Sequence, residues 1–141
     1  MDQVSRLPVL PAVPLPPAEI EAKREQARQS HERRYADDWV WDFVEGDGGT
    51  FDYGYDFFHC ATQKLYHAHG ADEFLPYYCY LDFVTVRRTG WGLTRTMTLA
   101  EGHDHCDFRF RLGGEAESGW PPPFLRTGRE DHVATTGQGA D

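Results

Sequence analysis

Residues 91–110 read WGLTRTMTLAEGHDHCDFRF and carry the clearest strand pattern in the chain. Threonines alternate with Leu93, Arg95, Met97 and Leu99, and a second alternation begins after the polar segment 100–105. Two alternating segments joined by a polar turn that contains glycine are typical of a β-hairpin. The pattern therefore predicts two antiparallel strands, over 91–99 and 106–112.

The second strand of this hairpin places a thiol next to the turn. Cys106 begins a face that it shares with Phe108 and Phe110, whereas Asp107 and Arg109 belong to the opposite face, because successive side chains of a strand point to opposite sides. A residue held by a strand beside an accessible loop suits a reactive group. Cys106 is therefore a candidate functional thiol.

The length of 141 residues is sufficient for one domain with a hydrophobic core. Aromatic residues make up 14% of the chain and concentrate between residues 50 and 110, so the core is expected there. A Pro-rich arm, residues 1–17, precedes this part, and a tail with several glycines and prolines, residues 113–141, follows it. We expect disorder in the arm and in most of the tail, and one folded domain over 18–112.

The formal net charge of −9 argues against a nucleic-acid backbone or an anionic membrane surface as a partner. No apolar run approaches the roughly 18 residues that cross a bilayer, and prolines interrupt the N-terminal apolar residues. Three cysteines are an odd number, which fits free thiols in a reducing compartment better than a disulfide framework. These features predict a cytoplasmic protein whose partner is a small molecule or another protein.

Helical patterns precede and follow a predicted strand. Pro17 and the acidic residues after it predict a helix that continues to about Val44, with an interruption near residues 36–38 as an alternative. Alternating aromatic residues predict a strand over 50–57.

Two further helices are predicted between this strand and the hairpin. Residues 60–70 read as a short helix closed by a glycine, and a mostly apolar helix, expected to be largely buried, follows from about Asp72 to Arg88. The fold class predicted from all elements is α+β, with several helices packed on a small antiparallel sheet in a single domain.

Asp82 is unusual because it lies within the apolar helix, between Leu81 and Phe83. An unpaired buried carboxylate is costly, so Asp82 needs a partner. One interpretation is a structural pair with an arginine such as Arg95. The other is a ligand with a planar amidine or guanidine cation, which takes two parallel hydrogen bonds. Arg95 and Arg109 are in turn candidates for binding a substrate carboxylate, although arginines on an acidic protein are more often surface residues.

Histidines lie close to the cysteines in the sequence. His67 falls on the same helical stripe as Cys60 and is a candidate base for a thiol nucleophile. His105 precedes Cys106, but neighbours on a regular strand point apart, so only loop geometry would bring them together. Zinc is an alternative, but paired Cys-x-x-Cys or His-x-x-x-His spacing is missing from the sequence, so we expect no metal.

Four segments of the chain form a distinctive combination: Cys60, Cys79-Tyr80-Leu81-Asp82-Phe83, residues 93–102 (LTRTMTLAEG) and residues 105–111 (HCDFRFR). Together they resemble the L-2-amino-thiazoline-4-carboxylic acid hydrolase family over about residues 50–112. The Gly-x-x-x-Cys-Asp-Phe ending is also similar to the small-molecule-binding domain of the vinyl-reductase type.

The family resemblance implies a cofactor-independent hydrolase. Water would add to the ring carbon between sulfur and nitrogen of a cyclic amidine, giving a carbamoyl-cysteine product. The residues implied are a thiol nucleophile (Cys106, Cys60 or Cys79), a histidine that moves the proton (His105 or His67), Asp82 for the amidinium, and Arg95 or Arg109 for the carboxylate.

Two features of the resemblance bear on assembly and on rival functions. The chain is short at its N-terminus for this family, so part of the helical layer would be missing or supplied by a second subunit of a homo-oligomer. The alternative functions are a non-catalytic small-molecule-binding module that uses the same pocket, and a zinc protein that uses Cys106 with nearby histidines.

Overall fold

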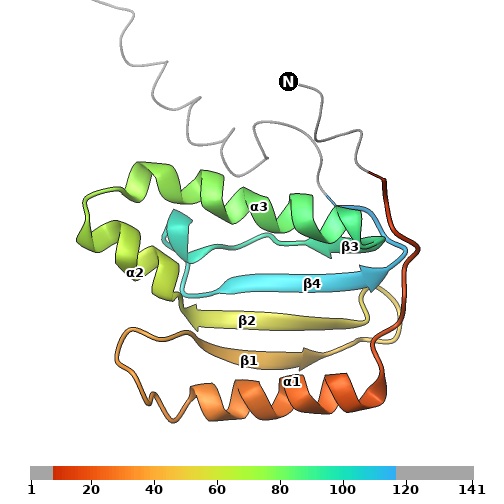
Figure 1. Cartoon of the computed structure of the whole chain (residues 1–141). Helices are drawn as coiled ribbons and strands as arrows, with labels where there is room; N and C mark the ends of the chain where they lie inside the picture. Colours follow the sequence, from red (N-terminus) through yellow and green to blue (C-terminus); the bar gives the residue numbers. More distant parts are fainter. Residues whose placement is uncertain (1–7, 117–141) are drawn as a thin grey trace, which may run out of the picture.

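The computed structural model describes residues 8–116, in which helices pack on one sheet of four strands (Figure 1). The elements are, in order, α1 Pro17–Ser30, β1 Val40–Glu45, β2 Tyr53–His59, α2 Ala61–Ala68, the 3₁₀ turn η2 Asp72–Phe74, α3 Leu75–Arg88, β3 Trp91–Thr94, the 3₁₀ turn η3 Leu99–Glu101 and β4 Cys106–Leu112. The predicted fold class is confirmed: the domain is α+β, with an antiparallel sheet.

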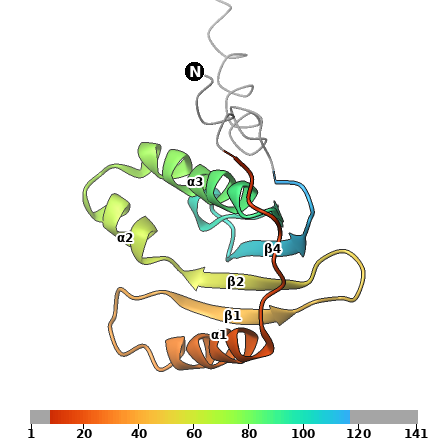
Figure 2. The ribbon, with the colours of Figure 1, turned by 45° about the vertical axis from the view of Figure 1, so that its right-hand side comes forward.

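The sheet has the strand order β1-β2-β4-β3, and every neighbouring pair is antiparallel (Figure 2). Strand β2 lies between β1 and β4, and its residues Tyr55 and Phe57 pair with Phe108 and Cys106. Because paired residues point to the same face of a sheet, this register puts the thiol of Cys106 in line with the aromatic side chains of β2.

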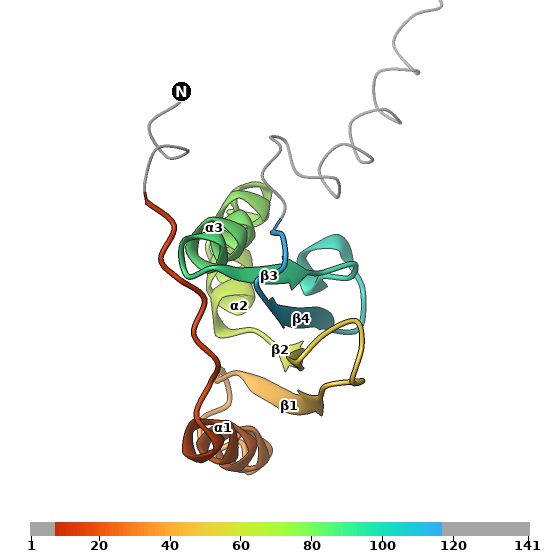
Figure 3. The same cartoon turned by 90° about the vertical axis from the view of Figure 1, so that its right-hand side faces the viewer.

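All three helices lie on the same side of the sheet (Figure 3). Helix α1 packs along β1, where Lys23 lies over the Tyr55 ring and Arg24 over the Phe43 ring. Helix α3 packs against β3 at the opposite edge of the sheet. The aromatic face of the two central strands therefore lies between α1 and α3.

The centre of the hydrophobic core joins α3 to the adjacent strands. Phe83 of α3, Leu93 of β3 and Phe110 of β4 are buried together, and the Tyr53 ring stacks on Phe110 with 4.8 Å between centroids. Burying such side chains stabilises the fold by about 1.5–3 kcal/mol each. This cluster fixes the middle of α3, which carries Asp82, against the sheet.

Helix α3 is less buried than the sequence predicts. Only Leu75 and Phe83 of α3 are fully buried, whereas Tyr77, Tyr78 and Leu81 are exposed. The physical reason is the open sheet: α3 covers one edge of it, and no second layer among the described residues covers the outer side of the helix.

The long N-terminal helix predicted as far as Val44 is wrong in its second half. Helix α1 ends at Ser30, and Val40–Glu45 form strand β1. Trp41 and Phe43 of this strand pair with aromatic residues of β2. The Trp41 ring meets the Tyr55 ring edge-on, with 4.9 Å between the ring centroids. Aromatic and β-branched residues with a pairing partner favour strand over helix.

The predicted hairpin is present with a longer connection. Strand β3 ends at Thr94, and residues 95–105 form an irregular loop that includes η3 before β4 begins. The predicted strand over 50–57 and the short helix over 60–70 correspond to β2 and α2.

Residues 8–16 run in an extended conformation between α1 and the end of α3 (Figure 1). The Leu10 N–H donates to the Arg88 carbonyl at 2.8 Å, and Trp91 Nε1 donates to the Val13 carbonyl at 3.2 Å. The first seven residues of the predicted arm and residues 117–141 of the predicted tail lie outside the described residues. Within the described part of the chain, no helix has the length and apolarity needed to cross a membrane.

Candidate active site

A cavity of about 280 Å³ lies between α2, α3 and the aromatic face of the sheet. Its lining includes the three cysteines of the chain, Cys60, Cys79 and Cys106. Asp82 and Arg95 line it as well, and Tyr55, Phe57 and Phe108 add aromatic rings from β2 and β4. The structure thus gathers residues that are far apart in the sequence, from Trp39 to Phe110, around one mostly apolar space.

Cys60 is the N-cap residue of α2. Its Sγ accepts a hydrogen bond from the Gln63 N–H at 3.4 Å, which satisfies one of the free donors at the start of the helix. Gln63 Nε2 also donates to the Leu99 carbonyl at 3.2 Å, so the start of α2 is tied to the loop before β4. Cys60 is partly exposed, and its Sγ lies at the N-terminus of α2 beside a backbone N–H donor.

The other two thiols are in more apolar surroundings. Burial raises the pKa of Cys79 to about 12. Burial also raises the pKa of Cys106, and the Leu99 N–H, which donates to its Sγ at 3.2 Å, opposes this only in part. Both groups are therefore held as neutral thiols near neutral pH.

Asp82 and Arg95 form an ion pair in the wall of the cavity. Arg95 Nη1 donates to Asp82 Oδ2 at 2.9 Å, and Arg95 Nη2 donates to the Cys79 carbonyl at 3.0 Å. The guanidinium lies 4.9 Å from the ring centroids of both Phe83 and Phe108, and the Arg95 side chain is 1% exposed. Arg95 is thus engaged by protein groups rather than directed to solvent, which corresponds to the structural pair considered from the sequence.

The Asp82 side chain remains 46% exposed, in contrast to that of Arg95. Burial raises the pKa of this carboxyl group, although Arg95 opposes the rise. Asp82 therefore places a carboxyl group with a raised pKa at the cavity wall, and the buried Arg95 holds this group in position.

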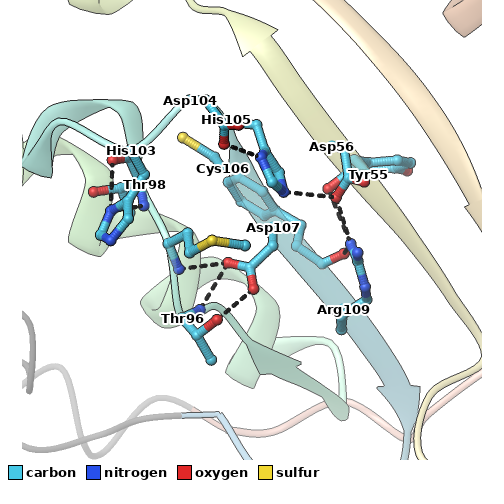
Figure 4. Close-up of polar contacts among 12 residues, drawn as sticks. Tyr55, Asp56, Thr96, Thr98, His103, Asp104, His105, Cys106, Asp107 and Arg109 are labelled. Atoms are coloured by element: carbon cyan, nitrogen blue, oxygen red, sulfur yellow. Dashed lines mark hydrogen bonds and ion pairs between the residues drawn. The ribbon is translucent and has the colours of Figure 1, made fainter.

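Asp107 organises the loop that precedes β4. This buried carboxylate accepts hydrogen bonds from the backbone N–H groups of Thr96 at 2.8 Å and Met97 at 2.6 Å, and from the Thr96 hydroxyl at 2.5 Å (Figure 4). The loop shaped in this way carries the Leu99 N–H to Cys106. No role was predicted for Asp107 from the sequence, although an acidic residue within a strand, directly after the candidate Cys106, was a signal that could have identified it.

His105 and Arg109 do not line the cavity. Arg109 is on the face of β4 opposite to Cys106 and donates to Asp56 Oδ1 at 2.8 Å. His105 Nε2 lies 4.0 Å from the same carboxylate oxygen, and Nδ1 contacts Asp104 at 2.5 Å. Both side chains therefore point away from the Cys106 thiol, as expected from the alternation of side chains along a strand.

His67 is also outside the cavity. It contacts Asp72 through Nδ1 at 3.0 Å at the far end of α2, and its side chain is 80% exposed. Lys64, on the same stripe as Cys60, donates to the Ala36 carbonyl at 2.9 Å. The helical stripe is therefore present, but its members bind different partners. Among the described residues, no group of three or more His, Cys, Asp or Glu side chains could hold a metal ion.

The model of the L-2-amino-thiazoline-4-carboxylic acid hydrolase family matches residues 18–110. The chain belongs to this family. Searches of curated proteins and of solved structures each found no match. Because the family is named for a hydrolase, membership supports hydrolase activity on a small molecule, and all cavity residues lie within the matched part of the chain.

Several cavity residues were not identified from the sequence as site residues. Trp39 lies in the connection before β1, which the sequence reading assigned to a helix. Tyr55 and Phe57 were placed on an aromatic strand face, but their proximity to the cysteines depends on the pairing of β2 with β4.

Proposed function

We propose that the protein is a cysteine-dependent, cofactor-independent hydrolase that opens a cyclic amidine of the 2-amino-thiazoline type. The observation that carries this proposal is the position of Cys60, Cys79, Cys106 and Asp82 around one cavity in a chain of this family. A thiol supplies the nucleophile, and a carboxylate supplies the group that binds an amidinium and transfers a proton.

Cys60 is the nucleophile in this proposal. It is partly exposed, and its Sγ faces a backbone N–H donor at a helix N-terminus, which is a typical setting of reactive cysteines. The raised pKa values of Cys79 and Cys106 disfavour their thiolates, so these two residues shape the cavity.

The reaction proceeds by two substitutions at the ring carbon between sulfur and nitrogen. The Cys60 sulfur forms a bond to this carbon, the bond to the ring sulfur breaks, and the ring sulfur leaves as the thiol of the product. Water then adds to the same carbon, and the bond to Cys60 breaks. One water is consumed, a carbamoyl group is formed, and the Cys60 thiol is restored without any change of oxidation state.

Asp82 binds the amidine nitrogens and moves the proton in both steps. In the first step it accepts the Cys60 proton and passes it to the departing ring sulfur, and in the second it takes a proton from water and returns one to the Cys60 sulfur. The raised pKa of Asp82 makes the protonated form accessible, which suits this role better than an ordinary carboxylate. Arg95 positions Asp82 through the bond from Nη1. His67 and His105 have no role in this scheme because they lie outside the cavity.

The setting of the enzyme follows from its thiols. All three cysteines are free, and a thiol-dependent enzyme needs a compartment that keeps them reduced. We therefore include a cytoplasmic location and a role in specialised metabolism in the proposal.

The test is ring opening of 2-amino-thiazoline-4-carboxylate by the purified protein, followed as release of a free thiol. The variants are Cys60→Ser, Cys79→Ser and Cys106→Ser, each with its fold checked by circular dichroism. We expect wild-type turnover, a loss of at least about 10³-fold in Cys60→Ser, and retained turnover in Cys79→Ser. Full turnover by folded Cys60→Ser would exclude Cys60 as nucleophile, and no turnover by the wild type would reject this substrate.

A further inference from the structure

A second hollow adjoins the cysteine cavity on the side of α1. It has a volume of about 590 Å³ and lies between the C-terminal half of α1, the connection to β1 and the aromatic face of the sheet. Trp39, Tyr55 and Phe57 line both spaces. The two hollows therefore share one aromatic wall, and we call the second one the α1 groove.

The floor of the α1 groove is aromatic. The Trp41 ring meets the Tyr55 ring at 4.9 Å and the Phe57 ring at 5.7 Å between centroids, and Tyr55 and Phe57 are 5.8 Å apart. Such a row of rings binds flat or apolar groups by stacking. Tyr35, which is 65% exposed, adds a further ring to the lining.

The α1 side of the groove is polar. Gln26 and Gln29 line it, and each carries an amide with both a donor and an acceptor. Gln29 Nε2 donates to Glu25 Oε1 at 2.6 Å. Lys23 also lines the groove, with its Nζ 5.7 Å from the Tyr55 ring centroid. The charged residues Glu32, Arg34 and Asp38 complete the polar rim. A polar rim that includes two amide side chains, above an aromatic floor, suits a ligand that has a planar apolar part and hydrogen-bonding groups such as an amide.

The cysteine cavity is poorly suited to a free carboxylate. Arg95 is the sole cationic side chain among the described residues that line it, and its guanidinium already bonds Asp82 and the Cys79 carbonyl. A ring that places its amidine on Asp82 would also bring its own carboxylate near another negative charge. Burying a charged group without a partner costs more than burying a neutral amide.

We infer that the substrate is a cyclic amidine whose ring carboxyl group is joined through an amide bond to an aromatic group, and that this group lies in the α1 groove. The inference rests on the proposed function, because it takes the reacting ring to be in the cysteine cavity. The ring occupies the cavity, the amide passes Trp39, and the aromatic group stacks on Trp41 and Tyr55 next to Gln26.

The test compares 2-amino-thiazoline-4-carboxylate with its benzylamide as substrates of the full chain. We expect the benzylamide to have a kcat/KM at least about tenfold higher than that of the free acid. Tyr35→Ala should lower kcat/KM for the benzylamide about fivefold and leave the free acid unchanged. Tyr77→Ala is the matched control, because Tyr77 is an exposed tyrosine of α3 that lines neither hollow, and it should change neither value.

Two results would overturn the inference. One is equal or faster turnover of the free acid together with its loss in Lys23→Met or Arg34→Met, which would make a cationic side chain of the groove the partner of a free carboxylate. The other is a preference for the benzylamide that Tyr35→Ala and Tyr77→Ala reduce alike.

Binding measurements separate this inference from the proposed function. Quenching of tryptophan fluorescence gives a Kd for each compound whether or not the ring is opened. Tighter binding of the benzylamide that weakens in Tyr35→Ala supports the groove even if no ring opening occurs, in which case the proposed reaction alone fails. Equal Kd values for acid and amide reject the groove.

Discussion

Arg95 links Asp82 to the carbonyl of Cys79 across one turn of α3, at 2.9 Å and 3.0 Å. The guanidinium is held between Phe83 and Phe108, so a cation that is 1% exposed fixes a carboxylate that is 46% exposed. The two members of the pair therefore have unequal surroundings. Arg95 behaves as part of the core, and Asp82 remains available to a ligand.

This asymmetry predicts that loss of Arg95 is costly. Arg95→Ala removes two hydrogen bonds and the contacts with two rings, and we expect it to lower the free energy of unfolding by about 2–3 kcal/mol. Arg95→Lys should be less stable than the wild type but more stable than Arg95→Ala, because an ammonium group cannot make the same forked pair of hydrogen bonds. Arg111→Ala, at an exposed position of β4, is the matched control and should change stability by less than about 0.5 kcal/mol. Urea unfolding measures all three, and an Arg95→Ala protein as stable as the control would contradict a structural role.

Asp107 provides a second prediction, on the loop between the two strands of the hairpin. Its carboxylate accepts the N–H groups of Thr96 and Met97, so Asp107→Ala leaves these donors without their acceptor and should cost about 2–3 kcal/mol. Asp107→Asn keeps one acceptor oxygen and should cost less. Hydrogen exchange at residues 96–99 should quicken in Asp107→Ala. Asp104→Ala is the control, since the Asp104 side chain is 88% exposed. Unchanged exchange in the loop would show that the carboxylate does not hold it.

The hairpin and the strand β2 could be predicted because their patterns are local. Apolar residues alternate with polar ones in each, and the alternation alone places Cys106 and Arg109 on opposite faces. The position of Asp82 among the apolar residues of a predicted helix likewise indicated that it would need a partner, and Arg95 was named as a candidate.

Strand β1 could not be predicted because its conformation depends on distant residues. Trp39, Val40, Phe43 and Val44 also fit a helical stripe, and only pairing with β2 makes the strand more stable. The same dependence hid the α1 groove: a helix that ran to Val44 would have placed Trp39 and Trp41 on its surface and not on the wall and floor of a groove.

The order of reactivity of the three thiols could not be predicted from the sequence either, because it depends on the burial of each thiol in the folded chain. Near pH 8 the thiolate fraction of a cysteine with a pKa of about 12 is very small and grows tenfold with each pH unit. We therefore expect iodoacetamide to label Cys79 slowly, with a rate that still rises steadily at about pH 10. Cys106 should also be slow, because burial raises its pKa and limits access. Cys60, which is partly exposed, should be labelled first.

Mass spectrometry of peptides from timed reactions gives the labelling rate of each cysteine separately. The control is the same reaction in denaturant, where the environments become equivalent and the three rates should converge. A substrate analogue in the cavity should protect Cys60 in the folded protein, because that thiol lines the space that the analogue occupies. Faster labelling of Cys106 than of Cys60 at neutral pH would contradict the assignment of Cys60 as the nucleophile and would transfer that role to the thiol at the start of β4.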